Sequence, residues 1–178
     1  MSGETPDPRY PLGPFEFAAL QPADRPALIA QMADAPSHLR SAVSGLSEAQ
    51  LDTPYRPGGW TIRQLVHHLA DGHMNWYIRT KLALTEPQPG IKPFDEAAWA
   101  ELSDSRTGPL EPSLALFDSL QTRWALLFKS LGPQDWSRTF LHPERGELSL
   151  DYVLSSMAWH ARHHTAHITE FRKRSFPL

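Results

Sequence analysis

The chain has 178 residues, a net charge of −3, six tryptophans and no cysteine, which suits one domain with a single hydrophobic core. The missing cysteines exclude disulfides, cysteine-bound zinc, iron–sulfur clusters and a cysteine nucleophile, so any metal must be held by nitrogen and oxygen. The slightly acidic balance predicts no general affinity for nucleic acid or anionic lipid, and no apolar run is long enough to span a membrane.

Residues 1–23 are rich in proline and are expected to form an extended arm on the surface. Proline lacks a backbone donor and fixes its own φ angle, so this segment cannot be a helix or a central strand. The start of the chain has neither the basic flank nor the apolar segment of a signal peptide, which predicts the cytoplasm. The apolar side chains expected to anchor the arm are Tyr10, Leu12, Phe15 and Phe17.

Two long helices are expected in the first half of the chain. The first begins after Asp24, a good N-cap, and runs to about residue 46 with a kink at Pro36. A short helical turn follows at 47–51. After the break at Gly58, Thr61 and Gln64 fit a capping box, and the second long helix is expected to continue to about residue 84.

The second half of the chain predicts two more long helices. Residues 87–93 form a loop and 95–102 a short helix, before a third long helix that starts near Ser113 and ends at Gly132. Residues 137–148 predict a small irregular hairpin, and Ser149 caps a last helix that reaches about residue 174. Four long amphipathic helices joined by irregular connections predict an all-α helical bundle, with residues 1–178 forming one domain.

The last helix carries an unusual concentration of histidine. Successive residues of a helix rotate by about 100°, which places all four of its histidines within a sector of roughly 100°. Imidazole is the commonest metal ligand, and a pair at i, i+4 can direct two ring nitrogens at one ion. A polar face hydrogen-bonded to water is the alternative, but the absence of flanking charge runs favours metal binding. The four residues are His160, His163, His164 and His167.

The second long helix offers three further histidines. His73 lies on the apolar stripe and is expected to be a core histidine that hydrogen-bonds to a neighbour. His67 and His68 flank the stripe on opposite sides, so one of them can turn toward the adjacent helix, and periodicity does not say which. Three neutral nitrogens plus solvent describe an open, catalytic type of metal site. Ala161 stands where zinc proteases of the His-Glu-x-x-His type carry glutamate, so their mechanism is not supported.

The segments Tyr55–Asn75 and Trp159–Ile168 closely resemble the DinB/YfiT-like metal-dependent hydrolases, and the similarity spans nearly the whole chain. The resemblance implies an up-down-down-up four-helix bundle that binds one divalent ion, nickel or zinc. Matching motif to motif implies that His67, His160 and His164 are the ligands. It leaves His163, His167 and His68 as residues that surround the ligands without binding the ion.

The resemblance implies specific site residues but leaves several reactions open. The leading expectation is a hydrolase whose metal activates a bound nucleophile, acting on a small-molecule substrate, with no general base identified. One alternative is a bacillithiol-type S-transferase that conjugates a low-molecular-weight thiol to electrophiles. Another is a non-catalytic metal-binding module, in which a further histidine would close the coordination sphere. The resemblance also implies a homodimer, with the proline-rich arm as a strap between subunits.

Overall fold

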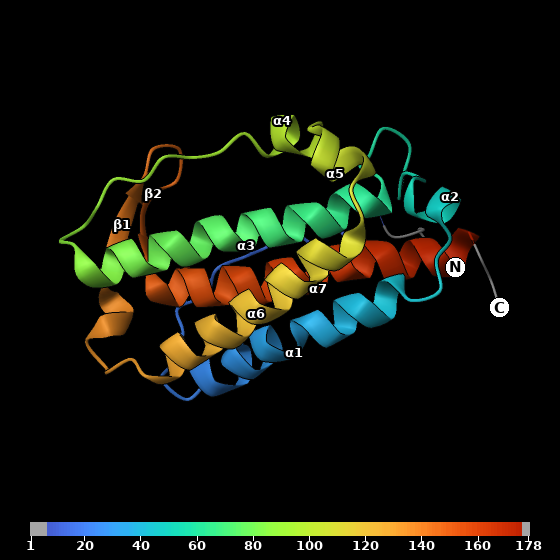
Figure 1. Ribbon diagram of the computed structural model, residues 1–178. Coiled ribbons are helices and arrows are strands. Elements are labelled where there is room, and N and C mark those ends of the chain that lie inside the picture. Colours follow the sequence, from blue (N-terminus) through green and yellow to red (C-terminus); the bar gives the residue numbers. More distant parts are fainter. Residues whose placement is uncertain (1–6, 176–178) are drawn as a thin grey trace.

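The computed structural model describes residues 7–175 and is built on four long helices (Figure 1). These helices are α1 (Arg25–Val43), α3 (Ile62–Thr85), α6 (Leu110–Lys129) and α7 (Leu150–Ser175). Both α1 and α3 pack against α6 and α7, so α1 and α3 lie diagonally across the bundle. Because α1 and α7 run in one direction and α3 and α6 in the other, the expected up-down-down-up topology is confirmed (Figure 1). None of the described helices is long and apolar enough to cross a membrane.

Short elements fill the connections between the long helices. They are α2 (Glu48–Leu51), α4 (Glu96–Ala100), α5 (Ser103–Thr107), the 3-10 helix η1 (Asp135–Ser137), β1 (Thr139–His142) and β2 (Gly146–Ser149). The two strands form the expected hairpin, in which Phe140 pairs with Leu148, and Gly146 has the positive φ of 74° that its turn requires. The sequence did not predict α5, and α6 begins at Leu110, slightly before the expected start.

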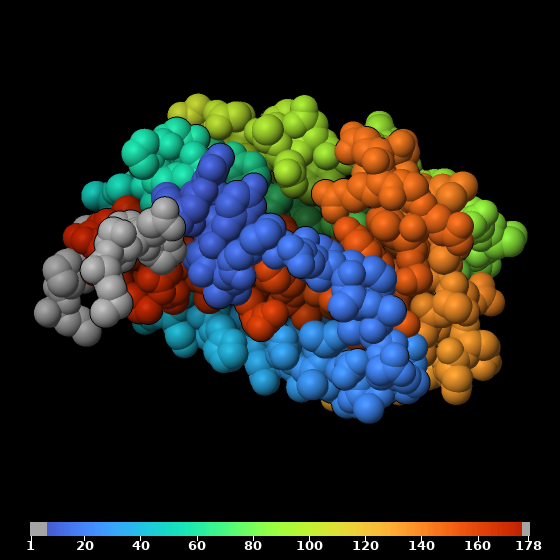
Figure 2. Space-filling model, turned by 180° about the vertical axis from the view of Figure 1, so that it is seen from behind, coloured from blue at the N-terminus to red at the C-terminus, as the bar shows by residue number. Residues whose placement is uncertain are grey.

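The N-terminal arm has no helix or strand in its described part, residues 7–23, and lies along α7 (Figure 2). The Phe15 ring contacts the rings of Tyr152 and Trp159, each with a centroid distance of 5.6 Å. The other expected anchors, Tyr10, Leu12 and Phe17, are 46%, 47% and 43% exposed, although the Phe17 ring also contacts Tyr152 at a centroid distance of 5.3 Å. Residues 1–6 of the expected arm lie outside the described residues.

A buried polar layer divides the hydrophobic core into two clusters. On α6, Phe117 belongs to one cluster and Trp124 to the other, and the fully buried Gln121 lies between them. His73 of α3 and His160 of α7 complete the layer, since the three side chains contact one another in sequence. The polar layer therefore connects α6 to the histidine-rich face of α7 through α3.

The start of α3 is fixed by the predicted capping box. The backbone N–H of Gln64 donates to Thr61 Oγ1 at 3.1 Å, and the Thr61 N–H donates to Gln64 Oε1 at 2.9 Å. Gln64 Nε2 also donates to the Ala100 carbonyl at 2.7 Å, which ties α3 to α4. This cap sets where α3 begins and so stabilises the turn that leads to its histidines.

Replacing Thr61 with alanine removes the side-chain acceptor of this box. We expect the free energy of unfolding to fall by about 1 kcal/mol, which urea denaturation followed by circular dichroism measures. Thr61→Ser keeps the hydroxyl and is the matched control. Equal losses in the two variants would show that the methyl group, and not the cap, stabilises this position.

Candidate metal centre

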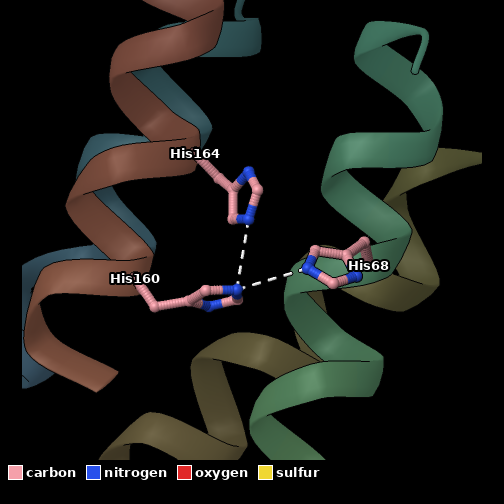
Figure 3. Close-up of side chains that lie close together, drawn as sticks. All are labelled: His68, His160 and His164. Atoms are coloured by element: carbon pink, nitrogen blue, oxygen red, sulfur yellow. Dashed lines mark hydrogen bonds between the residues drawn. The ribbon is translucent and has the colours of Figure 1, made fainter. Parts of the chain in front are cut away.

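Three histidines from α3 and α7 direct their Nε2 atoms at one point in the bundle (Figure 3). His160 Nε2 lies 3.2 Å from His68 Nε2 and 3.1 Å from His164 Nε2. His160 and His164 are one turn apart on α7, as their spacing predicts, and His68 faces them from α3. One ligand atom from each of the three lies within 4.8 Å of the other two.

The structure does not bring His67 to this cluster and places His68 there instead. His67 Nδ1 lies 2.7 Å from Ser113 Oγ, and its Nε2 lies 3.3 Å from the Gly108 carbonyl oxygen, so both nitrogens face the start of α6. Neighbouring residues of a helix point about 100° apart, and only the His68 direction meets α7. The geometry therefore groups His68, and not the expected His67, with His160 and His164. Burial could not separate the two residues, because residues 62–70 of α3 are all buried.

A chain of hydrogen bonds leaves His164 Nε2 with a free lone pair. The Arg9 carbonyl can only accept, so His167 Nε2, at 3.1 Å, donates to it. A neutral His167 then has an unprotonated Nδ1, which accepts from His164 Nδ1 at 3.3 Å. His164 thus carries its proton on Nδ1, and its Nε2 points at His68 and His160 unprotonated.

His160 belongs to a second chain, which ends at Gln121. His160 Nδ1 lies 3.2 Å from His73 Nε2, and His73 Nδ1 lies 2.5 Å from Gln121 Nε2. This hydrogen bond is the kind expected for His73 as a core histidine. With the amide nitrogen donating to His73, the proton of His160 falls on Nε2. With the amide turned by 180°, Gln121 Oε1 accepts from His73, and His160 Nε2 is left unprotonated.

The remaining two histidines of α7, His163 and His167, lie beside the cluster and contact His164. The His163 ring stacks on Trp159 with a centroid distance of 4.2 Å and an interplanar angle of 18°. Its Nδ1 is buried without a hydrogen-bond partner among residues 7–175. Both nitrogens of His167 are engaged in the chain from Arg9 to His164. The described residues that group as candidate metal ligands are thus His68, His160 and His164.

Burial keeps these imidazoles neutral. It lowers the pKa of His68 to about 4 and that of His73 to about 3. Burial, together with repulsion from neighbouring histidines, also holds the pKa values of His160 and His164 well below 6.5. Neutral imidazoles are the form that binds metal. Zn–N bonds of 2.0–2.1 Å in a tetrahedron separate two nitrogens by about 3.3 Å, close to the 3.2 Å and 3.1 Å that separate His160 Nε2 from its two neighbours. The donor set therefore fits a divalent ion.

Comparison with known proteins identifies the family of this chain. The sequence profile of the DinB superfamily matches residues 31–168. The chain belongs to the DinB superfamily. A Bacillus cereus protein named "putative metal-dependent hydrolase" is 51% identical over 171 residues, which cover 94% of this chain and 97% of the relative. A Bacillus mycoides protein of the same name is 50% identical with the same coverage.

The bundle of this DinB superfamily member also matches a solved structure. YfiT from Bacillus subtilis superposes with a TM-score of 0.92 at 45% identity, covering 94% of this chain and 97% of YfiT. YfiT is described as "a probable metal-dependent hydrolase with an unusual four-helix bundle topology". The resemblance seen in the two histidine-containing segments is thereby confirmed, together with the fold that it implied.

The lowered pKa values predict that the metal-free protein loses stability in mild acid. The unfolded chain protonates its histidines near pH 6.5, whereas the folded chain keeps His68 neutral down to about pH 4. The contribution of the neutral His68 to the free energy of unfolding is complete above pH 6.5, and it is lost as the pH falls from 6.5 toward 4. Urea denaturation of the metal-free protein at a series of pH values should show the free energy of unfolding falling across this window. A free energy of unfolding that stays constant between pH 7 and pH 4.5 would contradict the lowered pKa values of the buried histidines.

Proposed function

We propose that this protein is a divalent-metal-dependent hydrolase that binds one ion, nickel or zinc, through His68, His160 and His164. The observation that carries the proposal is the convergence of three neutral imidazoles, one of which is held with its lone pair toward the others by the Arg9 carbonyl. The names of the Bacillus relatives support a metal-dependent hydrolase. Nitrogen-rich sites suit nickel and zinc, and the absence of cysteine removes softer donors.

The proposed coordination sphere has only three protein ligands among the described residues. His167 has no nitrogen to spare, and the His163 ring is stacked on Trp159, so neither supplies a fourth ligand. An open sphere favours catalysis over a purely structural or storage role. When bound, such an ion supplies Lewis acidity and lowers the pKa of a coordinated water molecule. The protein's own contribution is to hold three neutral imidazoles together and to fix the direction of the His164 lone pair.

Alanine substitutions at neighbouring histidines of α3 test the ligand set directly. His68→Ala should lower metal affinity by more than about 100-fold, the upper end of what residues outside the ligand set typically change. His160→Ala and His164→Ala should do the same. His67→Ala is the matched control and should keep stoichiometric metal by elemental analysis after dialysis. The reverse result at positions 67 and 68 would restore the choice of His67.

The amide of Gln121 should influence the metal through His73. Gln121→Leu removes the acceptor, and we expect metal affinity to fall about 10–100-fold. Gln121→Glu offers oxygens in either orientation and should restore most of the affinity. Nitrogen NMR of the histidine rings should show His160 protonated on Nδ1 in the metal-bound protein. An unchanged affinity in Gln121→Leu would mean that this hydrogen-bond chain does not reach the ion.

Activity of the metal-reconstituted protein decides between the two reactions. The protein should hydrolyse activated esters or amides, and chelation of the metal should abolish the rate. Addition of a low-molecular-weight thiol together with a haloarene tests the alternative. A rate that saturates with thiol concentration and vanishes without thiol would replace the hydrolase with an S-transferase. Tight metal binding with neither activity would leave the non-catalytic metal-binding module.

The homodimer is likewise a proposal. Light scattering at micromolar concentration should give twice the chain mass of 20.1 kDa. In this structure the arm lies along α7 of its own chain, through Phe15, so an arm that straps two subunits together would have to extend this contact. A monomer would overturn the proposal and leave the metal site intact.

A further inference from the structure

A polar cavity of about 510 Å³ lies outside the histidine cluster, at the far end of α3. Trp76 and Arg79 of α3 line it, facing Phe94 in the segment before α4 and Arg145 in the hairpin turn. In Figure 2 the yellow-green segment that includes α4 and the orange hairpin lie next to each other on one face. A cavity of this size suits a small molecule.

Arg79 is a buried cation without an anionic partner in the part of the chain that the structure describes. It is 4% exposed, and its Nη2 donates to the Lys92 carbonyl at 3.3 Å. No carboxylate of residues 7–175 lies within 4.0 Å of its guanidinium. Its other interaction is with the Trp76 ring, whose centroid is 5.0 Å away. Most of its five N–H donors are thus available to a ligand.

A second guanidinium faces the same ring. Arg145 lies 6.0 Å from the Trp76 centroid, and its charge, after burial, contributes to lowering the pKa of Arg79. Two like charges around one indole destabilise the empty cavity, and burial of an unpaired charge adds to the cost. An anion placed between them would relieve both effects.

The mouth of the cavity restricts which anion can enter. Asp95, Glu96 and Glu144 line the cavity, and all three are exposed. Asp95 caps α4 by accepting from the Ala98 N–H at 2.9 Å, and none of the three forms an ion pair with Arg79. Exposed carboxylates at the entrance repel a dianionic phosphate. A ligand with a single carboxylate, or a zwitterion, is repelled less and can still reach the buried guanidinium.

We infer that this cavity binds the carboxylate group of a small molecule, with Arg79 as its principal contact. The planar guanidinium fork matches a carboxylate in a bidentate hydrogen-bonded pair. Trp76 and Phe94 supply apolar walls for the rest of the ligand. The carboxylate can belong to a simple acid or to an amino acid, whose ammonium group would face the acidic mouth.

This inference does not depend on the metal. Arg79 follows His68 by 11 residues, about three turns and roughly 16 Å along the axis of α3, so a carboxylate bound here is not a metal ligand. Binding at the cavity can therefore be measured in metal-free protein. If no carboxylate binds here, the proposed hydrolase is unaffected. If the protein binds no metal or hydrolyses nothing, the carboxylate site is unaffected.

Three matched probes test the inference by calorimetry and by the NMR shift of the Trp76 indole N–H. We expect 3-phenylpropanoate and L-phenylalanine to bind and to shift the Trp76 signal, whereas phenethylamine, which lacks the carboxylate, should not. Tighter binding of L-phenylalanine would identify a zwitterion as the preferred source of the carboxylate, and tighter binding of 3-phenylpropanoate a simple acid. Equal binding of phenethylamine, or no binding of either carboxylate, would overturn the inference.

Substitutions of Arg79 locate the site. Arg79→Gln should weaken carboxylate binding by at least about tenfold, the loss of one charge-assisted hydrogen bond, and Arg79→Lys should weaken it less. Arg123→Gln is the control, because Arg123 also lies over an aromatic ring, Tyr77 at 5.9 Å, but is exposed and outside the cavity. Arg79→Gln should keep its Tm, because the charge it removes is unpaired. Unchanged binding in both Arg79 variants would overturn the inference; if Arg79→Gln fails to fold, Arg79→Lys decides.

Discussion

The structure depends on the neutrality of the histidines inside the bundle. His160 contacts His68, His73 and His164, and no carboxylate in residues 7–175 hydrogen-bonds to any of the four. A proton on one ring would repel the next in a poorly solvated interior, so all four remain neutral at pH 7. A neutral imidazole has one donor and one acceptor nitrogen. In His164 and His160 the position of the proton therefore depends on the group at the end of each hydrogen-bond chain.

These end groups explain why distant segments belong to the site. The Arg9 carbonyl lies in the N-terminal arm, and Gln121 lies in the middle of α6. Neither is one of the three histidines, yet the Arg9 carbonyl fixes the tautomer of His164, and the orientation of the Gln121 amide decides that of His160. The contact of the arm with α7 through Phe15 and the polar layer within the core thus both influence the tautomers of the histidine cluster.

The sequence predicted the parts of this arrangement that are local. The Thr61 cap, the four long helices and the i, i+4 pair of α7 all follow from short-range spacing. The partner from α3 did not, because α3 is surrounded by α6, α7 and the α4–α5 segment and is buried on every side over residues 62–70. A helix buried all round has no polar face to orient it, so His67 and His68 looked equivalent. The Arg9 contribution is a backbone carbonyl, which leaves no trace in residue identity.

The two hydrogen-bond chains differ in one physical respect. A backbone carbonyl cannot become a donor, so His164 has a single neutral tautomer in this setting. A glutamine amide presents a donor or an acceptor after a 180° turn, so His160 has two. With the nitrogen facing His73, Gln121 Oε1 is buried without a partner in the described residues, and neither orientation satisfies the whole amide. The two orientations then differ by about one hydrogen bond, on the order of 1 kcal/mol, which is small beside the affinity of a metal site. The fold thus presets the tautomer of His164, and it leaves His160 with two tautomers, of which the one with a free Nε2 lone pair is the form that could bind an ion.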